Sequence, residues 1–168
     1  ATEIINAVKN DNANINGYEF SRRNLFLGQW IKHGDWAPDL HTRLFRRGKA
    51  RWAGDEIHDK IDLEGKRKLI KGFMYHYSNP SLKDQINKIN VFSDAFIRQR
   101  VREGKQWNAF EAIFRAWWRF FRAYFIRLGF LDGYRGFYIA VVSSFACLNR
   151  YTRIYEANLG LDENSSKK

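Results

Sequence analysis

The chain has 168 residues, which suits one domain with a hydrophobic core, or a compact part with an attached helical arm, and argues against two independent domains. Its formal charge of +11 indicates an anionic partner, and charge alone leaves nucleic acid, an anionic membrane surface and a phosphorylated small molecule open. The single cysteine excludes a disulfide framework and a cysteine metal site, and the longest apolar run, from Gly136 to Leu148, is shorter than the roughly 20 residues of a membrane-spanning helix.

The first half of the chain is predicted to be mainly β, after one short helix. Thr2 is placed to cap that helix, and the Asn-rich residues 10–17 end it. From Gly17 to residue 78 the sequence alternates in short runs typical of strands, namely GYEFSRRNLFL, HTRLFRR, ARWAG, DEIHDKIDL and KLIKGFMYHYS. The words RRGK and LEGKR between these runs are predicted to be hairpin turns.

The second half is predicted to be helical. The word NPSLKD, residues 79–84, combines a capping asparagine, a proline in the first turn and a serine three residues before an aspartate, which predicts a helix start. Apolar residues keep helical spacing from there to about Arg102. Two further helices are predicted over about residues 107–128 and 134–157, on either side of the interrupting word GFLDGYRG.

These elements predict an α+β fold in three parts. Residues 1–78 form a β-rich part, residues 79–157 form a three-helix arm, and residues 158–168 form a polar tail that we expect to be disordered. All four histidines fall in the β-rich part. Side-chain chemistry is therefore expected there.

The tetrapeptide IHDK, residues 57–60, places an imidazole beside a carboxylate at the end of a predicted strand. In such a pair Asp59 is a candidate general base and His58 a group that orients it. A solvated turn would have the same sequence, so this word leaves both interpretations open. A metal site made by His58, Asp59 and His76 is a further alternative, although the usual short spacings of metal ligands are absent.

The word RLFRRG, residues 43–48, places arginines on both faces of a predicted strand. Arg43, Phe45 and Arg47 share one face, and Leu44 and Arg46 share the other. Guanidinium groups close to the carboxylates of HGDWAPD can hold a diphosphate through paired hydrogen bonds. An edge strand with solvated arginines would have the same pattern, and both interpretations stay open here.

Taken in order, the words GYEFSRRNLFLGQWIKHGDWAPDLHTRLFRRGKARW, IHDK and HYSNPSL resemble the later half of bacterial family 2 glycosyltransferases of the lipopolysaccharide inner-core kind. The resemblance runs from about Gly17 to Leu82 and extends more loosely through GFLDGYRGFYIA. It implies the C-terminal portion of a GT-A fold, with short mixed and antiparallel strands followed by a three-helix arm. Two departures stand out: Asp59 stands where the family usually has glutamate, and the sequence contains no D-x-D metal motif. Either the chain is a C-terminal fragment that lacks the donor-binding half or it has lost donor binding, and we expect the fragment.

The resemblance also implies an activity for the whole enzyme. That enzyme would transfer a sugar from a nucleotide sugar to a lipid-linked saccharide such as lipopolysaccharide core, with inversion at the anomeric carbon. It would use a divalent metal, Mg or Mn, with ligands mostly upstream of this chain, and no metal ligand is assigned here. We expect it on the cytoplasmic, inner face of the bacterial inner membrane, and we expect the present chain alone to be inactive.

Residue by residue, the resemblance makes Asp59 the base that takes the acceptor proton, with His58 beside it. The resemblance implies contacts to phosphate for Arg43 and Arg46. It implies contacts to a sugar for Trp36 and Asp39, and a late metal or diphosphate contact for His76. A histidine bonded to a neighbour within a strand is the simpler alternative for the last of them.

The predicted second helix combines a narrow polar stripe with a broad apolar surface. Its polar stripe consists of one glutamate and three arginines at helical spacing, namely Glu111, Arg115, Arg119 and Arg122. Burying the apolar remainder needs a partner, which is either the membrane interface or the protein's own core. The candidate membrane contacts are Trp117, Trp118, Arg119, Phe121 and Arg122.

A basic, aromatic-rich RNA-binding module without catalysis is the alternative from another class. Arginines would contact phosphate there and aromatic rings would stack on bases. The excess of eight basic over two acidic residues between Arg98 and Arg127 suits RNA as well as an anionic membrane. The ordered words HGDWAPD, RLFRRG and IHD favour the transferase, because nucleic-acid binding explains the charge but not that order.

Overall fold

The computed structural model describes residues 2–9, 13–53, 60–77, 82–104 and 106–161. They form two compact units, which we call the sheet unit (Ala1–Trp30 and Trp36–Ser78) and the helical unit (Ile31–Asp35 and Asn79–Lys168). The mixed α+β content predicted from the sequence is confirmed, with the strands in the first half and the long helices in the second. The GT-A identity and the roles given to the predicted domains stay predictions.

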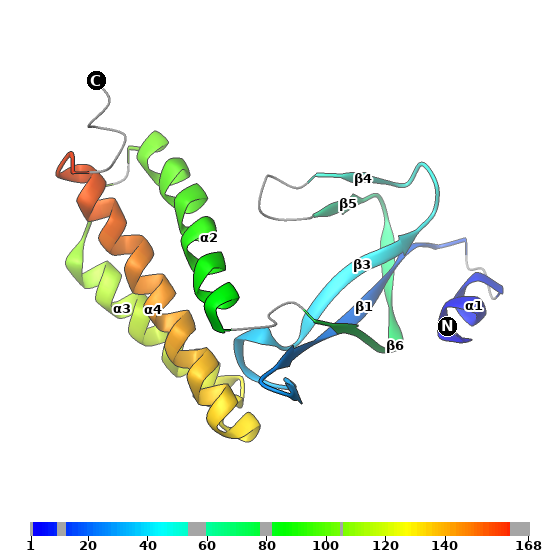
Figure 1. The fold of residues 1–168 in the computed structure, drawn as a ribbon. Coiled ribbons are helices and arrows are strands. Elements are labelled where there is room, and N and C mark those ends of the chain that lie inside the picture. The colour runs from blue at the N-terminus through cyan, green and yellow to red at the C-terminus, as the bar shows by residue number, and fades with distance from the viewer. Residues whose placement is uncertain (1, 10–12, 54–59, 78–81, 105, 162–168) are drawn as a thin grey trace. The chain divides into compact units, whose positions relative to one another are not determined.

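The main sheet is built around one long strand, β1 (Ile15–Phe26), as Figure 1 shows. β3 (Asp39–Phe45) pairs with it antiparallel, and β6 (Lys66–His76) pairs with it parallel. β2 (Gln29–Trp30) pairs with its end. The short helix α1 (Thr2–Lys9) precedes the sheet, as predicted. The parallel pair makes the sheet mixed.

The two predicted hairpin turns do not join paired strands, so that prediction is wrong. RRGK does form a turn, in which the Lys49 N–H donates to the Arg46 carbonyl at 3.0 Å. The strand before this turn pairs with β1, whereas the strand after it, β4 (Ala50–Trp52), pairs antiparallel with β5 (Ile61–Leu63). After LEGKR the chain continues as β6 along the other edge of β1. Because β1 is long enough to pair along both edges, these distant pairings override the local ones.

A tight hairpin connects β1 to β2 through Leu27 and Gly28. Both residues have positive φ, of 45° and 75°. A two-residue turn between antiparallel strands needs this conformation, because its twist then matches that of the strands. Leucine rarely adopts positive φ, so the sequence carries only half of the usual signal for this turn.

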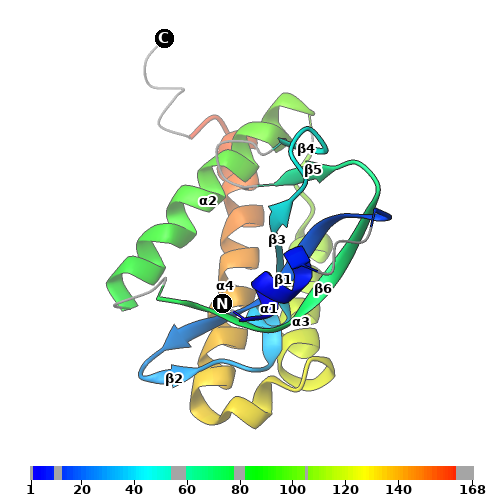
Figure 2. The ribbon, with the colours of Figure 1, turned by 90° about the vertical axis from the view of Figure 1, so that its right-hand side faces the viewer.

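The three predicted helices are confirmed, as α2 (Leu82–Arg102), α3 (Ala109–Phe121) and α4 (Gly133–Asn158). In the helical unit α3 and α4 lie side by side in both ribbon views (Figures 1 and 2), and α2 packs on α4. The α-helical part of α3 is shorter than the predicted helix, because the chain continues as a π-helical turn at Arg122–Ile126. A 3-10 turn at Gly129–Asp132 then leads into α4.

Small residues hold α3 and α4 close together. Ala112 of α3 is buried in a core with Tyr151 and Ile154 of α4, against which Phe96 of α2 packs. At the start of α4, an added Cβ at Gly136 would overlap the Gly129 carbonyl, so only glycine fits this approach. Among the helices that the structure describes, none has the length and apolar character needed to cross a membrane.

Candidate functional site

A polar network lies on one side of the main sheet, where β1, β3 and β6 are neighbours. We call it the Asp39 cluster, and it consists of Arg22, Asn24, Asp39, His41 and His76. The strand register produces it, because Arg22 pairs with Asp39 across β1 and β3, and Asn24 pairs with His76 across β1 and β6. Residues far apart in the sequence are thereby brought into hydrogen-bonding distance.

Asp39 is the centre of this cluster. Its Oδ2 accepts from Arg22 Nε at 2.7 Å and from Asn24 Nδ2 at 3.1 Å, and its Oδ1 accepts from His41 Nε2 at 2.7 Å. His76 Nδ1 donates to the Asn24 side-chain oxygen at 2.8 Å, which connects β6 to the same network. Each polar group is therefore held by its neighbours, as expected for a partly buried polar cluster.

The pKa of Asp39 lies below its ordinary value. Burial on its own would raise it, but the hydrogen bonds from Arg22 and Asn24 and the charges of Arg22 and His41 outweigh burial. The carboxylate is therefore ionised at neutral pH and accepts hydrogen bonds only. This suits it to bind hydroxyl groups and to hold an imidazole in a fixed orientation.

Asp39 is expected to make the stability of the sheet unit fall at acid pH. Because its pKa is lower in the folded than in the unfolded chain, its contribution is complete above the unfolded value of about 3.9 and is lost as the pH falls through the folded value. Urea unfolding followed by tryptophan fluorescence between neutral and acid pH measures this. Asp39→Asn should lower the free energy of unfolding by about 2 kcal/mol at pH 7 and make it depend less on pH in the acid range. Asp62→Asn, which removes an exposed carboxylate, should change neither the free energy of unfolding nor its pH dependence. If the free energy of unfolding of Asp39→Asn fell with pH as steeply as that of the native chain, Asp39 would not be the group responsible.

Three of the predicted substrate residues meet in this network. Asp39 and His76 belong to it, and the Trp36 carbonyl accepts a long hydrogen bond of 3.5 Å from Asn24 Nδ2. The Trp36 ring packs edge-on against Phe26, with ring centroids 5.3 Å apart. The structure thus brings together the two sugar contacts and the histidine named from the sequence.

Of the predicted phosphate contacts, Arg43 lies elsewhere on β3 and Arg46 follows the end of that strand. Arg43 is exposed at a bulge, where the register passes from Leu44 to Thr42 against consecutive residues of β1. A bulge turns a side chain away from the regular alternation, and Arg43 points to solvent there. Arg46 is half-buried, and its Nε donates to the Ile15 carbonyl at 3.0 Å. Arg46 therefore also fastens the start of β1.

The predicted base and its neighbour, Asp59 and His58, lie outside the described residues, and their roles stay predictions. The sequence reasoning did not single out Arg22, Asn24 or His41. A signal for the first two exists, because they stand two apart in the word RRN and so share one face of a strand.

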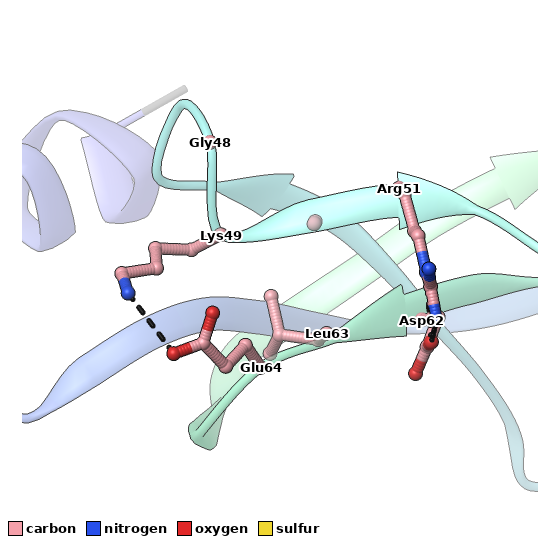
Figure 3. A pocket seen from close by; sticks show the side chains of 7 residues that line it. Gly48, Lys49, Arg51, Asp62, Leu63 and Glu64 are labelled. Carbon is pink, nitrogen blue, oxygen red and sulfur yellow. Dashed lines mark hydrogen bonds and ion pairs between the residues drawn. The ribbon is translucent and has the colours of Figure 1, made fainter.

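A shallow hollow beside β4 and β5 has paired charges along its walls (Figure 3). Lys49 Nζ lies 3.0 Å from Glu64 Oε1, and Arg51 donates to Asp62 Oδ2 at 3.0 Å. Cross-strand pairing of the two short strands explains this arrangement, since Arg51 stands opposite Asp62. Each charge along these walls is neutralised by its neighbour, so this hollow gives no reason to expect a charged ligand.

The described residues do not fit the expected divalent metal. Nowhere in the described ranges do three or more His, Cys, Asp or Glu side chains gather in a way that could hold an ion. The Asp39 carboxylate accepts hydrogen bonds from a guanidinium, an amide and an imidazole, and no second carboxylate belongs to the Asp39 cluster. The expectation of metal ligands upstream stays a prediction.

In the helical unit, α3 exposes a broad aromatic surface. Asn108 caps the helix by accepting from the Glu111 N–H at 2.9 Å. Trp117 and Trp118 are 53% and 42% exposed, and Trp117 stacks on the half-buried Phe121 at 5.4 Å. The exposed apolar residues of this aromatic face are Phe110, Ile113, Phe114, Trp117, Trp118, Phe125 and Ile126.

The polar stripe of α3 contacts a carboxylate that the sequence reasoning did not pair with it. The Asp35 side chain is 2% exposed, and its Oδ2 accepts from Arg119 Nε at 2.5 Å. Arg122 and Arg127 approach Oδ1, each at 3.5 Å. Lipid contact by Arg119 and Arg122 stays a prediction, and their bonds to Asp35 are additional to it.

A second buried carboxylate fixes the same short segment. Asp132 Oδ2 accepts from the backbone N–H groups of Lys32 and His33 at 3.0 and 2.8 Å, and Oδ1 accepts from His33 Nδ1 at 3.2 Å. The Gly34 N–H donates to the Arg127 carbonyl at 2.9 Å. Residues 31–35 are therefore bound to the helical unit through both backbone and side chains.

Comparison with known proteins finds relatives that carry transferase names. The chain is 31% identical over 127 residues to an uncharacterised glycosyltransferase of Rickettsia prowazekii (strain Madrid E), which covers 70% of this chain and 44% of the relative. It is 33% identical over 99 residues to one of Rickettsia typhi, covering 59% of this chain and 34% of the relative. It is also 27% identical over 142 residues to the lipopolysaccharide core biosynthesis glycosyltransferase LpsC of Rhizobium meliloti (strain 1021), covering 83% of this chain and 53% of the relative.

These matches support the coarse prediction of a glycosyltransferase. The chain spans about half the length of these curated relatives, or less. No protein-family model matches the chain, and no solved structure matches it. The relatives lend no support to the RNA-binding alternative.

Proposed function

We propose that this chain is the C-terminal portion of an inverting, family 2 glycosyltransferase of GT-A type, which moves a sugar from a nucleotide sugar to a lipid-linked saccharide such as lipopolysaccharide core. The observation that carries this proposal is the similarity to proteins named glycosyltransferases, one of them named for lipopolysaccharide core biosynthesis, over 59 to 83% of the chain. The ordered sequence words and the Asp39 cluster agree with it.

The proposed chemistry needs a base, a sugar site and contacts for the departing diphosphate. Asp59, oriented by His58, takes the acceptor proton while the acceptor oxygen bonds to the anomeric carbon and the bond to the diphosphate breaks. Asp39 is ionised and held on three sides, so its remaining acceptor capacity is available to a sugar hydroxyl. Arg43, exposed at its bulge, is free to turn toward phosphate on the donor or on a phosphorylated acceptor.

The helical unit supplies the proposed membrane contact. Trp117 and Trp118 are exposed on a face of several neighbouring aromatic residues, and such rings enter the headgroup boundary of a bilayer. A lipid-linked acceptor would be met at that surface. We therefore propose that the enzyme is peripheral on the cytoplasmic, inner face of the bacterial inner membrane.

The transfer activity is tested in a chain extended upstream to the length of the curated relatives. Such a chain, given a panel of nucleotide sugars and lipid-linked core saccharides, is expected to add one sugar with inverted anomeric configuration. Mass spectrometry detects the addition, and NMR of the product gives its configuration. The 168-residue chain should show no transfer under the same conditions. Retention of configuration would contradict the inverting assignment, and absence of transfer across the panel would contradict the proposal.

The membrane contact is tested on the chain itself. Replacing Trp117, Trp118 and Phe121 by serine should lower partitioning onto vesicles of phosphatidylcholine and phosphatidylglycerol by at least about tenfold, because the aromatic area that enters the interface is removed. Sedimentation with the vesicles measures it. Trp52→Ser removes an exposed tryptophan from the sheet unit and should leave partitioning unchanged. Equal losses in both variants would argue against α3 as the contact.

A further inference from the structure

The arginines around Asp35 form a compact basic site within the helical unit. Arg119 comes from α3, Arg122 begins the π-helical turn and Arg127 follows it. All three contact the one carboxylate of Asp35, at 2.5, 3.5 and 3.5 Å. Helical spacing puts Arg119 and Arg122 on one side of the helix, and the buried carboxylate of Asp35 brings Arg127 to the same place.

This site has more positive than negative charge. Three guanidinium groups meet one carboxylate, so a surplus of two positive charges remains. Asp35 is 2% exposed, whereas the three arginine side chains are 42%, 33% and 40% exposed. The carboxylate thus binds the inner side of the arginines, and their outer N–H groups face solvent.

A fourth arginine of the helical unit, Arg150 of α4, is half-buried. Burial, first, and the positive charge of Arg119 lower the pKa of Arg150. The Nε atoms of Arg122 and Arg150 are buried and have no hydrogen-bond acceptor among the described residues. Buried donors normally have a partner, so the Nε of Arg122, which is one of the three arginines around Asp35, indicates that an acceptor belongs here.

We infer that Arg119, Arg122 and Arg127, gathered around Asp35, bind a phosphate group, as a phosphate monoester or a diphosphate. A phosphate dianion matches the surplus of two charges, and its several oxygens match planar guanidinium donors better than a single carboxylate does. The inference does not depend on sugar transfer. It adds a phosphate site in the helical unit to the contacts predicted at Arg43 and Arg46.

The binding test uses the whole chain and inorganic pyrophosphate, titrated calorimetrically at low ionic strength. The native chain is expected to bind, and Arg119→Gln and Arg127→Gln should each weaken binding at least about tenfold, as the loss of one charge-assisted contact implies. Arg115→Gln is the matched control, because Arg115 lies one turn before Arg119 but is bonded to Glu111 at 2.7 Å. Its affinity should stay within about twofold of native, since that charge lies outside the site.

Two results would overturn the inference. One is the absence of pyrophosphate binding by the native chain. The other is an equal loss in Arg115→Gln and Arg127→Gln, which would show that general helix charge holds the ion. If Arg119→Gln fails to fold, Arg127→Gln decides the matter alone, because its contact with Asp35 is long at 3.5 Å and its removal spares the 2.5 Å bond.

Vesicles distinguish the source of the phosphate. If pyrophosphate displaces the native chain from vesicles that contain phosphatidylglycerol, and Arg127→Gln weakens both kinds of binding, the group is a lipid headgroup. If Arg127→Gln weakens pyrophosphate binding alone, the group belongs to a soluble ligand. The variant with serine at Trp117, Trp118 and Phe121 should still bind pyrophosphate, so loss of the proposed membrane contact leaves the phosphate site testable.

Discussion

Asp132→Ala is expected to lower the free energy of unfolding of the helical unit by about 3 kcal/mol. The carboxylate is buried and accepts from two backbone N–H groups, those of Lys32 and His33, and from the His33 ring. Alanine leaves these two backbone donors without the acceptor that they have in the native chain, and an unsatisfied buried donor costs about 1–3 kcal/mol. Asp132→Asn keeps one acceptor oxygen and should lie between the native chain and the alanine variant.

Urea unfolding followed by far-UV circular dichroism measures the loss. Hydrogen exchange gives the local readout, because the amides of Lys32 and His33 should lose protection in Asp132→Ala before the amides of α4 do. Asp62→Asn, which removes an exposed carboxylate from the sheet unit, serves as the control. Native protection at both amides in Asp132→Ala would show that the carboxylate does not hold this segment.

Asp59→Asn is expected to lower the rate of sugar transfer by about 10²–10⁴-fold in a chain of the relatives' length, which is the range that a general base contributes. Asparagine has nearly the same shape but cannot accept the acceptor proton. Nucleotide-sugar binding should be unchanged, so the effect should appear in kcat. His58→Ala should lower the rate of sugar transfer less than Asp59→Asn does. His58 only orients the base, so its removal leaves the proton acceptor in place.

Asp62→Asn is the matched control for that experiment. It lies three residues from Asp59, and its exposed carboxylate accepts from Arg51, so it tests the loss of a nearby negative charge without the loss of the base. Its turnover should remain within about twofold of native. Native turnover in Asp59→Asn would remove this carboxylate from the mechanism. Equal losses of turnover in Asp59→Asn and Asp62→Asn would show that sugar transfer depends on the negative charge of this region and not on Asp59 as a base.

Local patterns predicted most of the helices and strands, because those elements depend on neighbours in the sequence. The helix-start word NPSLKD and the apolar spacing that follows it up to Arg102 are local signals, and they predicted α2. The partners of β1 are not local: its parallel pairing with β6 joins Asn24 to His76, and no turn between them signals it. The hairpin prediction failed for the same reason.

The candidate site was likewise predicted from the sequence only in part. Asp39, Trp36 and His76 were predicted as substrate contacts from sequence words, and the structure joins them through Asn24. Arg22 and Asn24 carry a usable signal in their alternate spacing, whereas the bond between Asp132 and His33 spans 99 residues and has none. Buried carboxylates that bind distant backbone groups are found only when the fold is known.

The five residues from Ile31 to Asp35 belong to the helical unit although residues of the sheet unit precede and follow them in the chain. The two units are therefore interleaved along the polypeptide, and no single cut separates them. A fragment that starts at residue 79 would retain the arginines and Asp132 but lose Asp35 and the backbone groups that Asp132 holds. Dissection of this protein into separately produced halves would for that reason leave an incomplete helical half, whichever side of α2 is chosen for the break.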